Sequence, residues 1–106
     1  MIKAIVQEIN DIECTLEGEI TDGQSWAIFY ITKDAGYGCT VDENSFLQLI
    51  FGDDLVTNLS KADAYRFIEY FGEKEGGKWF AKTDRKAQFS ELYNEIMRLD
   101  GQDTLF

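Results

Sequence analysis

The pattern of apolar and polar positions is typical of strands in the first third of the chain. Residues 13–20 place Cys14, Leu16 and Ile20 on one side and acidic residues on the other, which predicts a half-buried strand. Asp22-Gly23 is a common hairpin turn, and residues 25–32 (SWAIFYIT) are apolar on both faces, as in a central strand. The sequence therefore predicts an N-terminal β-hairpin.

Two neighbouring segments are less clear. Residues 2–9 (IKAIVQEI) fit a helical spacing of apolar residues, whereas their β-branched content favours a strand; we favour the strand and leave the helix open. Residues 34–38 (DAGYG) predict a second turn, and residues 39–41 (CTV) then predict a third strand.

From residue 42 onward the period becomes helical. A short helix over residues 46–50, opened by Asp42 or Asn44, is expected to end near Gly52. A second helix should run from Ser60 to residue 71, because Ser60 with Asp63 three positions later resembles a capping box and apolar residues follow at helical spacing.

The end of the chain alternates between the two kinds of element. Gly76-Gly77 predicts a turn into a short strand over residues 78–82. Thr83 or Asp84 can then cap a last helix that ends at Gly101.

These elements together predict an α+β fold in a single domain over residues 1–101, followed by a short tail over residues 102–106. The expected architecture is a small antiparallel sheet, made of the N-terminal hairpin plus one or two further strands, packed against two or three helices. A hydrophobic content of 44% in 106 residues is enough for a core.

Charge is distributed unevenly along the chain. The formal net charge is −10, and residues 1–59 contain eleven acidic and only two basic side chains, with no lysine or arginine between Lys3 and Lys33. Such a surface repels nucleic acids and membranes and attracts basic partners. Six acidic residues form the candidate binding face: Glu8, Asp11, Glu13, Glu17, Glu19 and Asp22.

On a strand, Glu17 and Glu19 would lie roughly 6.8 Å apart on one face, about twice the axial spacing of phosphates along one DNA strand. The acidic face would then imitate a nucleic-acid backbone. The alternative is that the charges protect an edge strand from pairing or keep the surface hydrated.

The residue content excludes most catalytic sites. The chain contains no histidine and no proline, and its serines lack a GxSxG context. We therefore expect a protein that is not an enzyme and has no cofactor or metal. A metal-dependent hydrolase using Asp84 and Lys86 is a third possibility, although Asp84 is equally suited to capping a helix.

Cys14 and Cys39 are 25 positions apart without a CxxC motif, which favours free, buried thiols. No apolar stretch approaches the roughly 18 residues of a membrane span, and the N-terminus lacks the features of a signal peptide. We expect a cytoplasmic protein.

The C-terminal sequence Gln102-Asp103-Thr104-Leu105-Phe106 resembles the QxxLF pentapeptide with which bacterial replication and repair proteins bind the DNA polymerase sliding clamp. The resemblance implies that Leu105 and Phe106 fill an apolar pocket while Gln102 makes a polar contact. Asp103 departs from the apolar residue usual at that position. The alternative is that Phe106 folds back against the last helix.

In size, charge and absence of catalytic residues, the chain is similar to phage-encoded inhibitors of host defence nucleases, the anti-CRISPR and anti-restriction proteins, and to immunity proteins that neutralise nuclease toxins. This resemblance implies binding to a basic protein partner, a nucleic-acid-processing enzyme, whose groove the acidic face would occupy. It implies no direct contact with nucleic acid or membrane. A replication or repair adaptor held on the sliding clamp is the alternative.

Overall fold

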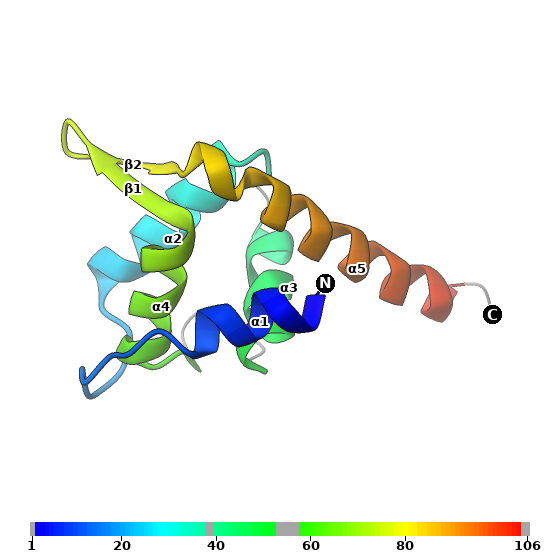
Figure 1. The fold of residues 1–106 in the computed structure, drawn as a ribbon, viewed down its shortest axis with the longest axis horizontal. Helices are drawn as coiled ribbons and strands as arrows, with labels where there is room; N and C mark the ends of the chain where they lie inside the picture. Colours follow the sequence, from blue (N-terminus) through cyan, green and yellow to red (C-terminus); the bar gives the residue numbers. More distant parts are fainter. Residues whose placement is uncertain (1, 38–39, 53–57, 105–106) are drawn as a thin grey trace.

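The computed structural model confirms the α+β class (Figure 1). It describes residues 2–37, 40–52 and 58–104, with the backbone alone at 40–42 and 100–104. In chain order the elements are α1 (Ile2–Asn10), α2 (Asp22–Asp34), α3 (Thr40–Phe51), α4 (Lys61–Phe71), β1 (Gly72–Glu75), β2 (Lys78–Ala81), the 3-10 turn η2 (Thr83–Arg85) and α5 (Lys86–Thr104).

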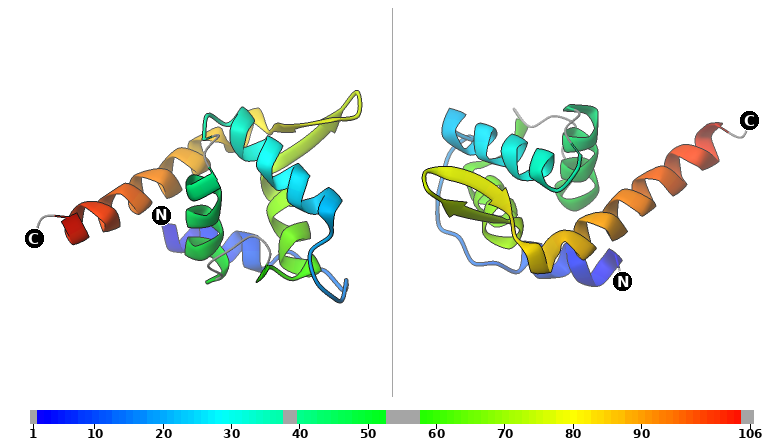
Figure 2. Two further views of the ribbon diagram at one scale, coloured as in Figure 1. Left: turned by 180° about the vertical axis from the view of Figure 1, so that it is seen from behind. Right: turned by 90° about the horizontal axis from the view of Figure 1, so that it is seen from above.

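The helices pack around a core made largely of aromatic rings. α2 contacts α4 and β2, while α1 and α3 contact each other and the first part of α5. Phe89 of α5 lies at the centre, with its ring centroid 4.1 Å from that of Phe71 and 5.2 Å from that of Phe46. The C-terminal half of α5 runs away from the other helices, which gives the molecule extents of 43 × 27 × 24 Å (Figures 1 and 2).

The preference for a strand at residues 2–9 is wrong. This segment forms α1, in which Ile5 and Ile9 are buried four positions apart. The helical spacing of the apolar residues decided the structure because one face of α1 packs on α3 and α4.

The predicted N-terminal hairpin is also wrong, because residues 22–34 form α2. The Thr21 hydroxyl accepts a hydrogen bond from the Gln24 N–H, and the Gln24 side-chain oxygen accepts one from the Thr21 N–H, both at 3.1 Å. This capping box starts a helix where Asp22-Gly23 was expected to turn between strands. The apolar residues that predicted a strand with two apolar faces instead form a buried side and an exposed, aromatic side of α2.

Residues 13–20 and 40–41 are not strands either. Residues 13–20 are extended without a strand partner, except for an isolated bridge between Glu19 and Ser60. The third predicted strand is replaced by α3, which begins at Thr40; Cys39 lies outside the described residues. A short run in which apolar and polar residues alternate does not by itself specify a strand, because a strand also needs a partner to pair with.

The helices of the second half are confirmed, with changes at their ends. α3 is longer than expected and stops before Gly52, which has φ 83°. α4 begins at its predicted cap, since the Asp63 N–H donates to the Ser60 hydroxyl at 3.1 Å. α5 continues through Gly101 to Thr104, because a single glycine costs a helix about 1 kcal/mol and does not end it by itself.

The sheet consists of one hairpin, β1 and β2, of which only β2 was expected. Gly76 and Gly77, at φ 60° and 79°, form the predicted turn between them. The expected caps of the last helix, Thr83 and Asp84, instead form the 3-10 turn η2, and the helix starts at Lys86.

Candidate functional site

The six acidic residues of the candidate binding face all have exposed side chains. They follow one another from α1 through the connection to the start of α2, and we call residues 8–22 the acidic segment. Glu8 belongs to α1 and Asp22 is the first residue of α2, whereas the others lie in the connection. The face is therefore a path along the surface and not one side of a strand, so the regular spacing expected for Glu17 and Glu19 is wrong.

Hydrogen bonds to main-chain groups of the acidic segment hold it against the beginning of α4. The Arg66 Nε donates to the Ile12 carbonyl at 2.8 Å, and the Lys61 N–H donates to the Gly18 carbonyl at 2.9 Å. The Ile20 N–H donates to the Leu59 carbonyl at 3.1 Å. These contacts use the main chain and leave the carboxylates of the segment facing solvent.

Within the described parts of the chain, no basic side chain forms an ion pair with the acidic segment. The two ion pairs among these residues are Arg66–Asp63 and Arg98–Glu95. Glu8 accepts a hydrogen bond from the Tyr70 hydroxyl at 3.1 Å, and Asp11 accepts one from the Gln7 amide at 2.6 Å. The charge of the segment is thus not neutralised by internal pairing.

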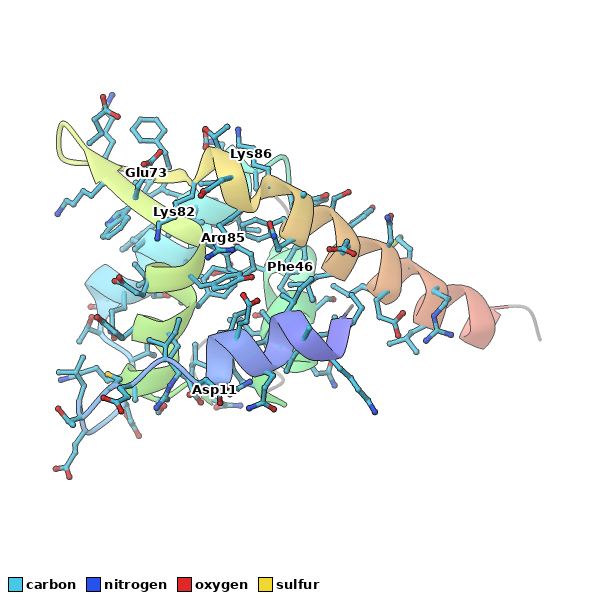
Figure 3. All side chains as sticks on the ribbon, viewed as in Figure 1. Asp11, Phe46, Glu73, Lys82, Arg85 and Lys86 are labelled. Carbon is cyan, nitrogen blue, oxygen red and sulfur yellow. The ribbon has the colours of Figure 1, made fainter. Side chains whose placement is uncertain are left out.

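The N-terminal end of the acidic segment borders a hollow of about 470 Å³ that also contains two basic residues. Lys82 and Arg85 line it together with Glu8, Asp11 and Tyr70, and three of these are labelled in Figure 3. The Arg85 guanidinium lies 4.2 Å from the Tyr70 ring centroid. The acidic character is therefore concentrated at the other end, from Glu13 to Asp22.

Tyr70 is held in this hollow as a hydrogen-bond donor. Burial and the hydrogen bond to Glu8 raise the pKa of Tyr70 to about 12, with the nearby Arg85 acting in the opposite direction. The phenol is neutral at physiological pH, and its hydroxyl fixes one oxygen of Glu8. The arrangement positions the start of the acidic segment relative to α4.

A second surface, which was not predicted from the sequence, lies between α2 and the hairpin. A groove of about 860 Å³ is lined by four aromatic side chains. Trp26 and Tyr30 on α2 and Phe80 on β2 are exposed, and Trp79 on β2 is half-buried. We call this surface the aromatic groove. Trp26 and Tyr30 are 59% and 46% exposed and stack on each other, with centroids 5.8 Å apart. Exposed aromatic groups of this kind are common where proteins bind partners.

The sequence contains a signal for this surface that the strand interpretation hid. In a helix, Trp26 and Tyr30 are four positions apart and lie on one side, while Ala27, Ile28 and Ile31 lie on the other and are buried. Thr21 and Gln24 have the spacing of a capping box.

Glu43 of α3 is a buried acidic residue. The residue is 5% exposed, and its Oε1 atom has no hydrogen-bond partner among the residues that the structure describes. Burial raises the pKa of Glu43 to about 7 from its ordinary value of 4.5. The group is therefore partly protonated near neutral pH.

Candidate catalytic and metal-binding residues are not brought together in the described residues. No group of three or more aspartate, glutamate, cysteine or histidine side chains there could hold a metal ion. Asp84 and Lys86 are exposed at η2 and the start of α5. Cys14 is a half-buried free thiol.

The residues of the proposed clamp-binding motif are not tested by the structure. Gln102 belongs to the last turns of α5, where only the backbone is described, and Leu105 and Phe106 lie outside the described residues.

Comparison of the chain with protein families, with curated proteins and with solved structures finds no significant match in any of the three. Among the described residues, no helix has both the length and the apolar character needed to cross a membrane.

Proposed function

We propose that the protein acts by binding and not by catalysis, with the acidic segment occupying the basic, nucleic-acid-binding surface of another protein. One observation supports this most directly: six exposed carboxylates follow one another along residues 8–22, and none of them pairs with a described basic side chain. A basic surface on the partner would supply positive charges that pair with these carboxylates. The net charge of −10 on the whole chain would accelerate association with such a partner.

The proposed effect on the partner is inhibition by competition. Carboxylates that occupy a groove evolved for phosphates exclude the nucleic acid from it. The proposed partner is a nucleic-acid-processing enzyme in the cytoplasm, either a defence nuclease countered by a phage protein or a nuclease toxin neutralised by an immunity protein.

The test is a charge reversal with a matched control. The triple variant Glu13→Lys, Glu17→Lys and Glu19→Lys changes the net charge from −10 to −4. The control reverses three exposed acids elsewhere, Glu75, Asp84 and Glu91, and reaches the same net charge. Proteins captured from a bacterial extract are washed at low and high salt and identified by mass spectrometry.

We expect the unmodified protein and the control to retain a nucleic-acid-binding enzyme that high salt releases, and the triple variant to lose it. The unmodified protein should also inhibit the purified enzyme. Equal capture or inhibition by the triple variant would contradict the proposal, because only the position of the reversed charges differs from the control.

A second candidate is a replication or repair adaptor that binds the sliding clamp through its C-terminal sequence. The observation that favours it is the direction of α5, whose C-terminal end runs away from the other helices (Figure 1). Clamp binding by the full chain should depend little on salt, since the contact is mainly apolar. A version without residues 102–106 should not bind the clamp. Clamp binding that survives the deletion would exclude this candidate.

A further inference from the structure

The aromatic groove lies between α2 and the hairpin. The two elements are joined by a hydrogen bond of 2.9 Å from the Ala81 N–H of β2 to the Asp34 carboxylate at the end of α2. Gly23, at the start of α2, and Gly77, in the hairpin turn, also line the groove. Figure 2 shows α2 and the hairpin diverging from their meeting point, which gives the groove its shape.

One wall of the groove is the outer edge of β2, where backbone groups are free to pair. Glu75 and Lys78 flank the two-residue turn and exchange hydrogen bonds with each other, so Lys74 and Trp79, the next opposed pair, do not. The N–H and C=O of Trp79 consequently point away from β1. The Ala81 N–H points the same way and is satisfied by Asp34 of α2, which shows that this edge faces the groove.

The register of β1 and β2 also shows which side chains lie on each face of the hairpin beside that edge. Trp79 and Ala81 share a sheet face with Gly72, and this face lies on α2: a Cβ atom at Gly72 would be 2.3 Å from the Ile31 Cδ1. Lys78 and Phe80 share the opposite face. An added strand would therefore direct alternate side chains toward Trp79 and the aromatic residues of α2, and the intervening ones toward Lys78 and Phe80.

The charge of the groove is opposite to that of the molecule as a whole. Lys33 and Lys78 line it, and its one acidic lining residue, Asp34, is already engaged by the Ala81 N–H. Lys74 lies 5.6 Å from the Trp79 ring centroid on the neighbouring strand. A long polyanion such as a nucleic acid is repelled by the net charge of −10, whereas a short segment with a few carboxylates interacts mainly with these nearby lysines.

We propose that the aromatic groove binds an extended peptide segment of another protein, which pairs with the edge of β2 at Trp79 and has alternating apolar and acidic side chains. Pairing of this kind supplies affinity through the main chain and specificity through alternate side-chain positions. The apolar residues of the segment cover Trp26, Tyr30 and Trp79, its carboxylates pair with Lys78 on the other face, and Lys33 of α2 adds to the positive charge around the groove. This binding site is independent of the acidic segment and goes beyond the function proposed above.

The first experiment selects ligands from a displayed library of random peptides of about eight residues, slightly longer than an average strand. The full chain and the double variant Trp26→Ala, Tyr30→Ala are used in parallel. We expect the unmodified protein to enrich peptides that alternate apolar and acidic residues and the double variant to enrich none of them. No enrichment, enrichment of basic peptides, or equal enrichment on both proteins would overturn the proposal.

The second experiment titrates the most enriched peptide into isotope-labelled protein and follows the amide signals of Trp79 and Ala81 by NMR. N-methylation of peptide nitrogens that face β2 should weaken binding about tenfold or more, and N-methylation of the alternate nitrogens should not. Lys33→Glu with Lys78→Glu should also weaken it. Binding that is insensitive to both changes would rule out strand pairing.

Two controls distinguish peptide binding in the groove from binding elsewhere on the surface and from self-association. Met97→Ala, at an exposed position on α5, should leave peptide affinity unchanged, as should the charge reversal of the acidic segment. Thermal unfolding of each variant verifies that the fold persists. Sedimentation gives the oligomeric state: a dimer that Trp26→Ala dissolves would show that a second copy of the chain covers the groove, which would overturn the peptide proposal.

Discussion

The acidic segment and the aromatic groove meet at the first turn of α2, yet they are built in different ways. Asp22 ends the one and the adjacent Gly23 lines the other. The acidic segment exposes charged side chains, and main-chain hydrogen bonds hold its backbone in place. The aromatic groove exposes aromatic rings and a strand edge, and side-chain packing between α2 and the hairpin holds these in place. A partner of the segment should therefore depend on salt, and a partner of the groove on geometry.

The largest expected effect weakens the acidic segment and the aromatic groove together, because both surfaces are supported by the same hydrophobic core. Phe89→Ala deletes the ring that contacts Phe46, Phe67 and Phe71, and the cavity should cost about 3–5 kcal/mol of unfolding free energy. Chemical denaturation measures this loss, and both binding activities should fall together. The exposed Phe80→Ala should change stability far less. A small loss for Phe89→Ala would contradict its central position in the core.

The second prediction uses pH to change the stability of the whole protein through one buried carboxyl group, that of Glu43. Because the pKa of Glu43 is raised to about 7 in the fold from 4.5, its stabilising contribution is complete below pH 4.5 and is lost as pH rises toward 7. The total loss is on the order of 3 kcal/mol at alkaline pH.

Glu43→Gln, a neutral group of the same shape, should remove this pH dependence. The variant should be more stable than the original protein above pH 7 and similar to it near pH 4. Denaturation curves across this range test the prediction, and the difference between the two proteins isolates Glu43 from other carboxylates. A constant difference at all pH values would show that the pKa of Glu43 is not raised by folding.

The third prediction alters the groove and spares the acidic segment. In Gly72→Ala the new Cβ would lie 2.3 Å from the Ile31 Cδ1 and 3.0 Å from the Ile68 carbonyl oxygen, so either the buried Ile31 side chain must leave its rotamer or α2 and the hairpin must separate. The cost should be roughly 1–3 kcal/mol. Adding Ile31→Val removes the Cδ1 atom, and a double-mutant cycle should then show recovery of part of that loss. Purely additive losses would contradict the close contact.

The same two regions show what the sequence could and could not predict. α4 and the Gly76-Gly77 turn were predicted because Ser60 and the paired glycines specify their geometry locally. α2 was missed because its apolar residues cover both sides of the segment, and one of those sides is the exposed Trp26–Tyr30 face of the groove. The sequence shows which residues are acidic, but their arrangement depends on contacts with residues far along the chain, such as Lys61 and Arg66.

The smallest expected effect alters the acidic segment and spares the groove. Arg66→Ala removes the hydrogen bond to the Ile12 carbonyl and the ion pair with Asp63, at a cost of about 1 kcal/mol because the guanidinium is only partly buried. Hydrogen exchange should accelerate at the Ile20 and Lys61 amides, which donate the hydrogen bonds between the segment and the start of α4, and remain unchanged at Ala81. Arg98→Ala, which breaks the exposed pair with Glu95, is the matched control and should produce neither change. If exchange at the Ile20 and Lys61 amides is as slow in Arg66→Ala as in the original protein, the segment is held by its main-chain bonds alone, and its charges keep their arrangement without Arg66.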